Sequence, residues 1–254
     1  MNYHNPTFRV LKILELIDKS TDGISLSEIS STLEMPQGTI SPILKTLLAL
    51  HYVRQTGNLY RIDFASFELG LSYSSENNAL TFIRRQMREI VSEIGEICQM
   101  GVLRGRDVYY LLKENANTFI QINSNVGMRM PAHITGLGKA LLSGLSDDEV
   151  RRLYEDYEFI SYTPQSITDM DVLIGQLDEV RKKGFAYENE ESTPDICCVA
   201  VPLEENGRIR AAISVTIPKF RYSEEMRKDI IKLLGQKKKL IEENCFVQNV
   251  HMDF

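Results

Sequence analysis

The chain has 254 residues, is 43% hydrophobic and carries a formal net charge of −6. It contains no apolar run of the roughly 18 residues that a membrane helix needs, and its polar start, MNYHNPTFR, lacks the apolar core of a signal peptide. We therefore expect a cytoplasmic protein with no membrane partner. The four cysteines have neither zinc-site spacing nor the density of a disulfide scaffold, so we expect reduced thiols, no metal and no cofactor.

Three amphipathic helices are predicted near the start of the chain. The first spans residues 8–18, where apolar side chains recur at helical spacing. The second begins after Ser25, which lies three positions before Glu28 and so forms a capping box. The third follows a tight turn and covers TISPILKTLLAL, and YVRQTGNLYRI then alternates around Gly57 and Asn58, as β-hairpins do. This is the order of a winged helix-turn-helix domain, whose third helix enters the DNA major groove.

Pro42 constrains where the third helix starts. A proline past the first turn removes a hydrogen bond of the helix and costs about 3 kcal/mol. If Thr39 is the N-cap, Pro42 falls within the first turn, where its missing N–H costs nothing. We therefore predict a late helix start, at Gly38 or Thr39.

The window 35–62 holds no Asp or Glu, although the whole chain is acidic. Carboxylates repel DNA phosphates, so this local gap can matter more than the net charge. A gap of this length can also arise by chance, and a helical domain that docks protein would tolerate it. We favour DNA on the order of the elements together with this window; the polar side chains of the third helix also suit base edges, and those of the hairpin suit phosphates. The candidate DNA-contact residues are Gln37, Gly38, Thr39, Ser41, Lys45, Arg54, Asn58 and Arg61.

The rest of the chain mixes helices with antiparallel strands. A segment of small and polar residues, 63–78, is interpreted as the linker between a first domain of residues 1–75 and a second domain of residues 76–254. Beyond the linker, the pattern predicts a long amphipathic helix, a hairpin turning at residues 105–106, three helices, a hairpin turning at 206–207 and a closing helix. Helices distributed around an antiparallel sheet make an α+β domain.

Several stretches resemble motifs of the IclR family of bacterial transcription regulators: LKILELI, LSEISSTLEMPQGTISPILKTLLALHYV, MRMPAHITGLGKALLS, YTPQSIT, EVRKKGFAYENEES, CVAVP and AAISVTIP. Their order and spacing cover nearly the whole chain. The resemblance implies an all-α winged helix-turn-helix domain followed by an α+β, GAF-like effector-binding domain with an antiparallel sheet. Two departures imply a different operator and ligand. Ser41 and Pro42 stand where the family commonly has basic or His side chains, and Glu188 and Leu137 stand where Asp and Ala are frequent.

The resemblance also implies a small-molecule pocket in the second domain. From the residues alone, Gly136 and Leu137 open a predicted helix, where unpaired N–H groups favour an anion. Ser214 and Thr216 lie two apart on a predicted strand and so face the same side. In the family, the corresponding positions line the effector site together with an acid and a cysteine. The candidate effector residues are Gly136, Leu137, Glu188, Cys198, Ser214 and Thr216, with Met128 and Met130 as apolar walls.

Each candidate also has an ordinary structural interpretation. The glycines allow close packing, Cys198 and the methionines fit a core, and Glu188 can lie solvated in the loop ENEES. A catalytic alternative pairs Cys198 with His133 as thiol and base, although the latter can equally orient the loop that follows it. Against catalysis, the sequence has no G-x-S-x-G, H-E-x-x-H, phosphate loop or zinc cluster. A third alternative is a ligand-binding adaptor whose first domain docks protein.

We interpret the chain as a regulator of transcription with no catalytic residues, and as a repressor rather than an activator. Its expected partners are a near-palindromic double-stranded DNA operator, a small carboxylate effector and a second copy of the chain, as a homodimer or a homotetramer. The sequence does not identify the effector, and it does not say whether the effector releases or strengthens DNA binding.

Overall fold

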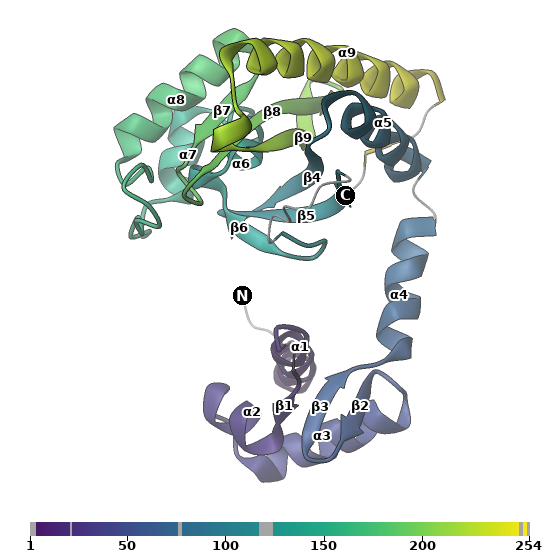
Figure 1. Ribbon diagram of the computed structural model, residues 1–254. Helices are drawn as coiled ribbons and strands as arrows, with labels where there is room; N and C mark the ends of the chain where they lie inside the picture. The colour runs from purple at the N-terminus through teal and green to yellow at the C-terminus, as the bar shows by residue number, and fades with distance from the viewer. Residues whose placement is uncertain (1–3, 21, 76–77, 117–123, 249–250, 253–254) are drawn as a thin grey trace. The chain divides into compact units, whose positions relative to one another are not determined.

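The computed structural model describes residues 4–20, 22–75, 78–116, 124–248 and 251–252 (Figure 1). The chain divides into two compact units, residues 1–77 and 78–254. The boundary expected from the sequence lies between residues 75 and 76, and residues 76–77 fall outside the described part of the chain. No helix among the described residues is long and apolar enough to cross a membrane.

The first unit is a helical domain with a small antiparallel sheet. Its elements are α1 (Asn5–Asp18), β1 (Ile24–Ser25), α2 (Leu26–Thr32), α3 (Gln37–Ala49), β2 (Val53–Thr56), β3 (Leu59–Ile62) and α4 (Phe64–Ser75). The three strands pair in the order β1-β3-β2. The predicted capping box is present, since Ser25 Oγ accepts the Glu28 N–H at 3.3 Å and the Glu28 carboxylate accepts the Ser25 N–H at 2.8 Å. The unit is a winged helix-turn-helix domain, in which β2 and β3 form the wing.

A single apolar core holds the first three helices together. The buried side chains come from one face of each helix, from β1 and from the first wing strand: Ile13, Ile17, Ile24, Ile29, Ile40, Leu44, Leu47 and Val53. Because α3 contributes three of them, its inner face is fixed against α1 and α2, and its polar face points away from the core.

The predicted late start of α3 is wrong. The helix begins at Gln37 with Pro36 as its N-cap, so Pro42 lies in the helix interior. The side chains that hold this helix are Ile40 and Leu44, which are 0% and 1% exposed. Their burial outweighs the lost hydrogen bond of Pro42. That bond would have gone to the carbonyl of Gly38, which is an exposed residue.

The predicted linker is largely a helix, α4, rather than an irregular segment. Three of its apolar side chains are exposed to solvent: Phe64 by 59%, Phe67 by 57% and Leu69 by 61%. The helical pattern is hard to detect in this sequence, because these apolar residues find no core within the first unit to pack against.

The second unit is an α+β domain. Its helices are α5 (Asn78–Ile94), α6 (Gly136–Leu142), α7 (Asp147–Leu153), α8 (Met170–Lys183) and α9 (Glu224–Gln248), with short 3₁₀ turns η1 (Ala132–Ile134) and η2 (Lys219–Arg221). Its strands are β4 (Ile97–Arg104), β5 (Asp107–Glu114), β6 (Arg129–Pro131), β7 (Ala186–Asn189), β8 (Ile196–Glu205) and β9 (Arg208–Pro218). They form one sheet in the order β6-β5-β4-β9-β8-β7, and every pair is antiparallel.

Both faces of this sheet are covered by helices (Figure 1). Helices α5 and α9 pack on one face, and α6, backed by α7 and α8, packs on the other. Successive side chains of a strand point to opposite faces of the sheet. On β8, Val199 and Val201 pack in the core beneath α5 and α9, whereas Ala200 packs in the core beneath α6, α7 and α8. Both predicted hairpins are confirmed. The second turns at Asn206 and Gly207, whose φ angles of 52° and 71° lie in the left-handed region that a tight hairpin turn uses.

Candidate functional site

A small pocket lies between the α6 face of the sheet and the loop after β7. Its cavity volume is about 90 Å³, well below the roughly 300 to 1,000 Å³ of drug-sized sites, so it suits a small organic molecule. All eight candidate effector residues line this pocket: Gly136, Leu137, Glu188, Cys198, Ser214, Thr216, Met128 and Met130. Residues more than 80 positions apart in the sequence therefore share one cavity.

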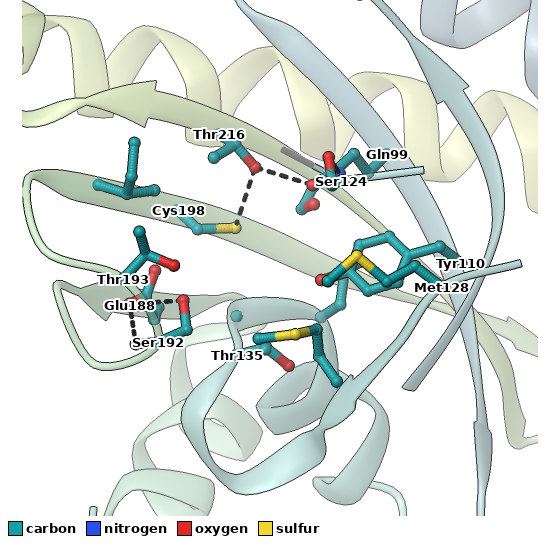
Figure 2. A pocket seen from close by; sticks show the side chains of 15 residues that line it. Gln99, Tyr110, Ser124, Met128, Thr135, Glu188, Ser192, Thr193, Cys198 and Thr216 are labelled. Carbon is teal, nitrogen blue, oxygen red and sulfur yellow. Dashed lines mark hydrogen bonds between the residues drawn. The ribbon is translucent and has the colours of Figure 1, made fainter. Parts of the chain in front are cut away.

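The sheet forms the floor of the pocket through side chains on three neighbouring strands. Thr216 on β9 pairs with Cys198 on β8, and Ser214 pairs with Gln99 on β4. The hydroxyl of Thr216 donates to Gln99 Oε1 at 3.0 Å and lies 3.9 Å from the Cys198 sulfur (Figure 2). The Ser214 hydroxyl is fully buried and has no hydrogen-bond partner among the described residues. An orphan hydroxyl of this kind is costly unless something fills the pocket.

Helix α6 begins at the pocket, as its sequence predicts. Thr135 is the N-cap, and its hydroxyl accepts the N–H of Gly138 at 3.0 Å. The N–H groups of Gly136 and Leu137 lie in the first turn, so no carbonyl of the helix accepts a hydrogen bond from them. Close packing also explains both glycines, because a Cβ on Gly136 would meet the Cys198 sulfur at 2.9 Å and one on Gly138 would meet a backbone oxygen at 2.0 Å. The structural interpretation of the glycines and the binding interpretation are thus compatible.

Glu188 is buried rather than solvated, with only 1% of its surface exposed. Its Oε1 accepts hydrogen bonds from the backbone N–H groups of Glu191, at 2.6 Å, and Ser192, at 3.1 Å. Figure 2 shows this carboxylate beside Ser192 and Thr193 at one end of the pocket. Burial raises the pKa of Glu188 to about 7. The group can therefore accept a hydrogen bond from a ligand, or donate one once it is protonated.

Sequence reasoning missed several polar residues of the pocket. They are Gln99, Tyr110, Ser124, Thr135, Ser192 and Thr193. In the sequence, β4 and β5 show only the pattern of a β-hairpin, with no sign of a binding site. Gln99 is placed opposite Ser214 by the register between β4 and β9, which the sequence does not reveal. A signal was available for Thr135 alone, which precedes the predicted start of α6 and is a residue type that caps helices.

A buried ion pair that the sequence analysis did not identify holds the loop after β7. Lys139 is 1% exposed, and its ammonium donates to both carboxylate oxygens of Glu191 at 2.7 Å. It also donates to Gln176 Oε1 and to the carbonyl of Tyr187, each at 2.7 Å. A lysine inside the apolar run GLGKALL was the available signal, since buried lysines are nearly always paired. Glu188 itself lies on strand β7, and the pair fixes the loop that follows it against α6 and α8.

No hydrogen bond joins His133 and Cys198. The His133 ring is completely buried against the edges of Tyr154, Tyr157 and Phe159, and neither of its nitrogens has a hydrogen-bond partner among the described residues. Burial lowers the pKa of His133 to about 4 and raises the pKa of the Cys198 thiol to about 12. The imidazole therefore stays neutral and packs as an aromatic ring, and the sulfur stays a protonated thiol.

The candidate DNA-contact residues lie on α3 and the wing. Gln37, Gly38 and Lys45 on α3 and Arg54 and Asn58 on the wing are exposed, whereas Thr39, Ser41 and Arg61 are half-buried. The guanidinium of Arg61 donates to the carbonyl of Asp22 through Nε at 3.2 Å and Nη2 at 2.6 Å, so it braces the loop before β1. Arg54 and Arg61 are directly opposed in the hairpin and share one face. Two opposed cations repel each other unless an anion lies nearby.

Two protein-family models match this chain, one in its N-terminal part and one in its C-terminal part. Residues 7–57 match the IclR helix-turn-helix domain, and residues 71–241 match the family described as bacterial transcriptional regulator IclR C-terminal. The chain is 30% identical to the HTH-type transcriptional regulator KdgR of Escherichia coli over 89% of this chain and 87% of that one. It is 28% identical to the HTH-type transcriptional repressor AllR of Escherichia coli over 85% of this chain and 81% of that one.

Among solved structures, the fold matches an IclR homologue from Microbacterium hydrocarbonoxydans complexed with 4-hydroxybenzoate. The TM-score is 0.82 at 19% identity, over 95% of this chain and 99% of that one. This likeness shows a shared fold. The two domain matches and the likeness to KdgR identify the whole chain: the protein belongs to the IclR family of bacterial transcriptional regulators and is a DNA-binding regulator of transcription.

Proposed function

We propose that this regulator is a repressor whose second domain binds a small carboxylate, and that this binding changes its affinity for a near-palindromic operator. The observation that carries the effector part is the buried, unpartnered hydroxyl of Ser214 in a polar-lined cavity. A relative named as a repressor, AllR, supports the direction of control. The homologue complexed with 4-hydroxybenzoate supports an organic acid as the effector.

The pocket offers complementary groups for such a molecule. The first N–H groups of α6, at Gly136 and Leu137, suit a carboxylate. The hydroxyls of Ser214 and Thr216 suit further oxygen atoms, and Met128 and Met130 supply apolar contact. A cavity of about 90 Å³ favours short acids over aromatic ones such as 4-hydroxybenzoate, unless the wall formed by the methionines moves aside.

The first domain offers a polar helix face and a basic wing for DNA. Gln37, Thr39 and Ser41 are hydrogen-bonding side chains near the start of α3, the part of a recognition helix that contacts base edges. Lys45 and Arg54 are exposed cations with no ion-pair partner among the described residues, and they suit phosphates. Arg61, held against Asp22, acts mainly by supporting the wing.

Dimerisation is supported by exposed apolar side chains of the first unit. Leu11 on α1 is 53% exposed, and Phe64, Phe67 and Leu69 on α4 are exposed to a similar extent. Burying these groups against a second copy would remove apolar surface from water and present two α3 helices to two half-sites. Sedimentation should give a dimer for the wild type and a monomer for the double variant Phe64→Ser, Phe67→Ser. A wild-type monomer at micromolar concentration would contradict this arrangement.

The DNA interface is tested by the salt dependence of binding. Replacing Lys45 or Arg54 by Ala should weaken binding to all sequences and should flatten the salt dependence by about 0.9 log units for each phosphate that is no longer neutralised. Glu225→Gln, an exposed substitution on α9 in the second domain, is the control. An unchanged salt slope in both alanine variants would remove these residues from the interface.

The effector pocket is tested by thermal shift of the purified protein against a panel of small carboxylates. One acid should raise the melting temperature with saturation, because a ligand that binds only the folded state stabilises it. Ser214→Ala and Glu188→Gln should weaken that shift. If no acid in the panel stabilises the wild type, the carboxylate assignment is wrong, even if operator binding is intact.

A further inference from the structure

The stretch YTPQSIT, residues 162–168, lies between α7 and α8, and none of its side chains lines the effector pocket. Its place is fixed by packing, since Ile167 is 3% exposed and belongs to the core beneath α6, α7 and α8. Two of its hydroxyl groups, on Thr163 and Ser166, donate hydrogen bonds to the loop that follows β7. Because this loop lines one end of the pocket, the stretch supports a wall of the pocket from outside.

The hydrogen bonds that Ser166 accepts determine where its own proton points. A hydroxyl has one proton and two lone pairs. The Ser166 oxygen accepts the backbone N–H groups of Tyr162 and Thr163, each at 2.9 Å, so both lone pairs are occupied. The proton is left to donate to the carbonyl of Glu191, at 2.7 Å. The direction of this hydroxyl is thus set by its own neighbours, and it points at the loop.

Thr163 holds the preceding carbonyl of the same loop. This residue is 5% exposed, and its hydroxyl oxygen accepts the N–H of Gln165 at 3.1 Å. Its proton donates to the carbonyl of Glu190 at 2.6 Å, whereas the Glu191 carbonyl is more distant, at 3.4 Å. The two hydroxyls therefore hold two consecutive carbonyls, one each.

These two carbonyls belong to the peptide groups that bind Glu188. A peptide group joins the C=O of one residue to the N–H of the next in one rigid plane. The C=O of Glu190 thus shares a plane with the N–H of Glu191, which donates to Glu188 Oε1 at 2.6 Å. The C=O of Glu191 shares a plane with the N–H of Ser192, which donates to the same oxygen at 3.1 Å (Figure 2). Two chains of hydrogen bonds therefore lead from a hydroxyl, through a peptide group, to the carboxylate.

We propose that Thr163 and Ser166 are positioning residues, which orient the two N–H groups that bind Glu188 and so set how readily this carboxyl ionises. A peptide group whose oxygen accepts a hydrogen bond is a stronger donor through its N–H. Donors to a carboxylate favour its charged form, so the two hydroxyls lower the pKa of Glu188 and oppose the burial that raises it to about 7.

The ionisation of Glu188 affects the effector because both share one small cavity, of about 90 Å³. In so small a space, an ionised Glu188 repels a bound carboxylate more than a protonated one does. Thr163 and Ser166 therefore adjust the pH range in which the pocket accepts an anion. This part of the inference rests on the proposed function, because it assumes a carboxylate effector, whereas the link from the two hydroxyls to Glu188 does not.

Other ionisable groups face Glu188 from the elements around it. The ammonium of Lys139 on α6 lowers the pKa of Glu188, and the carboxylate of Glu191 in the loop raises it. The thiol of Cys198 on β8 and the phenol of Tyr110 on β5 stay neutral, because burial raises the pKa of both. Burial also raises the pKa of Glu191. A test must therefore separate the titration of Glu188 from that of Glu191.

The test follows the free energy of unfolding of the full-length protein against pH, by urea denaturation and without a ligand. Each profile is taken as the difference from the same protein carrying Glu188→Gln, which leaves only the contribution of Glu188. This contribution falls as the pH rises, and the pH at which the fall ends marks the pKa in the folded state. In Thr163→Val, which keeps the shape of the side chain without its hydroxyl, the fall should end at a pH higher by about 0.5 to 1.

Ser166→Ala should extend the fall in the same direction. Thr163→Ser keeps the hydroxyl and should follow the wild type. The matched control is Ser143→Ala at the end of α6, where a half-buried serine donates to the carbonyl of Ala140 at 2.8 Å, away from the loop. This variant removes a hydrogen bond of the same kind, so its profile can be displaced in free energy, but its fall should end at the wild-type pH.

A fall that ends at the wild-type pH, or at a lower one, in either folded variant would overturn the inference, even if the variant is less stable. The same holds if Thr163→Ser behaves like Thr163→Val, because the hydroxyl would then not be the cause. Each substitution removes a single oxygen atom or less, and if one of the two variants does not fold, the other decides alone. No acid is present in this test, so its failure leaves the carboxylate effector untouched, and a protein that binds no carboxylate still gives a result here.

Discussion

Glu188 illustrates, at the scale of single residues, how the pocket changes the chemistry of a side chain. An ordinary glutamate has a pKa near 4.5, whereas burial raises the pKa of Glu188 to about 7. The folded protein therefore holds this proton more tightly than the unfolded chain does. The resulting stabilisation is complete below pH 4.5 and is lost as the pH rises through 7. At a pH above 7 the folded state carries a buried charge that the backbone hydrogen bonds of Ser192 and Glu191 and the Lys139 ammonium offset in part.

Glu188→Gln should remove this pH dependence. The amide oxygen of glutamine can still accept the N–H groups of Glu191 and Ser192, but the side chain no longer ionises. The free energy of unfolding of the variant relative to the wild type should therefore increase between about pH 5 and about pH 8, as measured by urea denaturation. Glu225→Gln, exposed on α9, should run parallel to the wild type. If the free energy of unfolding of Glu188→Gln also changed with pH in the same way as that of the wild type, the buried carboxyl would not titrate in this range.

The sequence indicates most of the candidate residues but not their contacts. Ser214 and Thr216 lie on one face because strand alternation requires it. The sequence does not decide whether Glu188 lies in the pocket or in solvent. The reason is that no sequence pattern fixes the conformation of the loop that covers this residue. Gln99 escapes prediction because its place depends on pairing between strands more than 100 residues apart. Periodicity describes a strand by itself, whereas register is a property of two strands.

Helix α3 is an element in which local and tertiary preferences conflict. Pro42 in its interior costs one backbone hydrogen bond, and the buried face of the helix compensates. Pro42→Ala should therefore stabilise the first domain by about 1–3 kcal/mol. The substitution removes the cost of a proline in the helix interior, but it also gives the unfolded chain more conformational freedom, which offsets part of the gain. Thermal unfolding measures the change. Pro36→Ala, at the N-cap, removes no such conflict and should have little effect. A Pro42→Ala variant no more stable than the wild type would contradict this explanation of α3.

The contact between α6 and the loop after β7 depends on the buried pair of Lys139 and Glu191. Lys139→Met should reduce the free energy of unfolding by about 3–5 kcal/mol, because it leaves a buried carboxylate without its counter-charge. Adding Glu191→Leu should recover most of that decrease. Urea denaturation measures both changes. Lys239→Met, which breaks an exposed pair with Glu243, should change stability by less than about 1 kcal/mol. A single variant at position 139 with wild-type stability would show that the pair does not hold the loop.

Elements with strong periodicity or turn chemistry are predictable from the sequence, and those fixed by tertiary contacts are not. The capping box of α2 and the hairpin turns follow from local residue types. The N-terminus of α3 does not, because hydrophobic packing overrides the local preference of Pro42. The sequence indicates only a linker where α4 lies, because the apolar side chains of this helix have no partner in the first unit that would reveal a buried face.

At the scale of the whole molecule, an acid-free window lies within an otherwise acidic chain. The net charge of −6 would disfavour DNA if charge were spread evenly, but the window 35–62 lies on α3 and the wing. Ligand control requires that the effector binds differently to forms that do and do not bind the operator. The pocket and α3 belong to different units, so coupling between them is a property of the assembled protein and must be measured on it.

The most direct test of this coupling is the fluorescence anisotropy of a labelled DNA duplex that the protein has selected from a random pool. The titration is done with and without a carboxylate that stabilises the protein. We expect a sequence-specific complex whose dissociation constant changes at least about tenfold with the acid, and we expect Ser214→Ala to abolish the response while still binding the duplex. A dissociation constant that is unaffected by every such acid, or the absence of any selected sequence, would contradict control of DNA binding by a carboxylate.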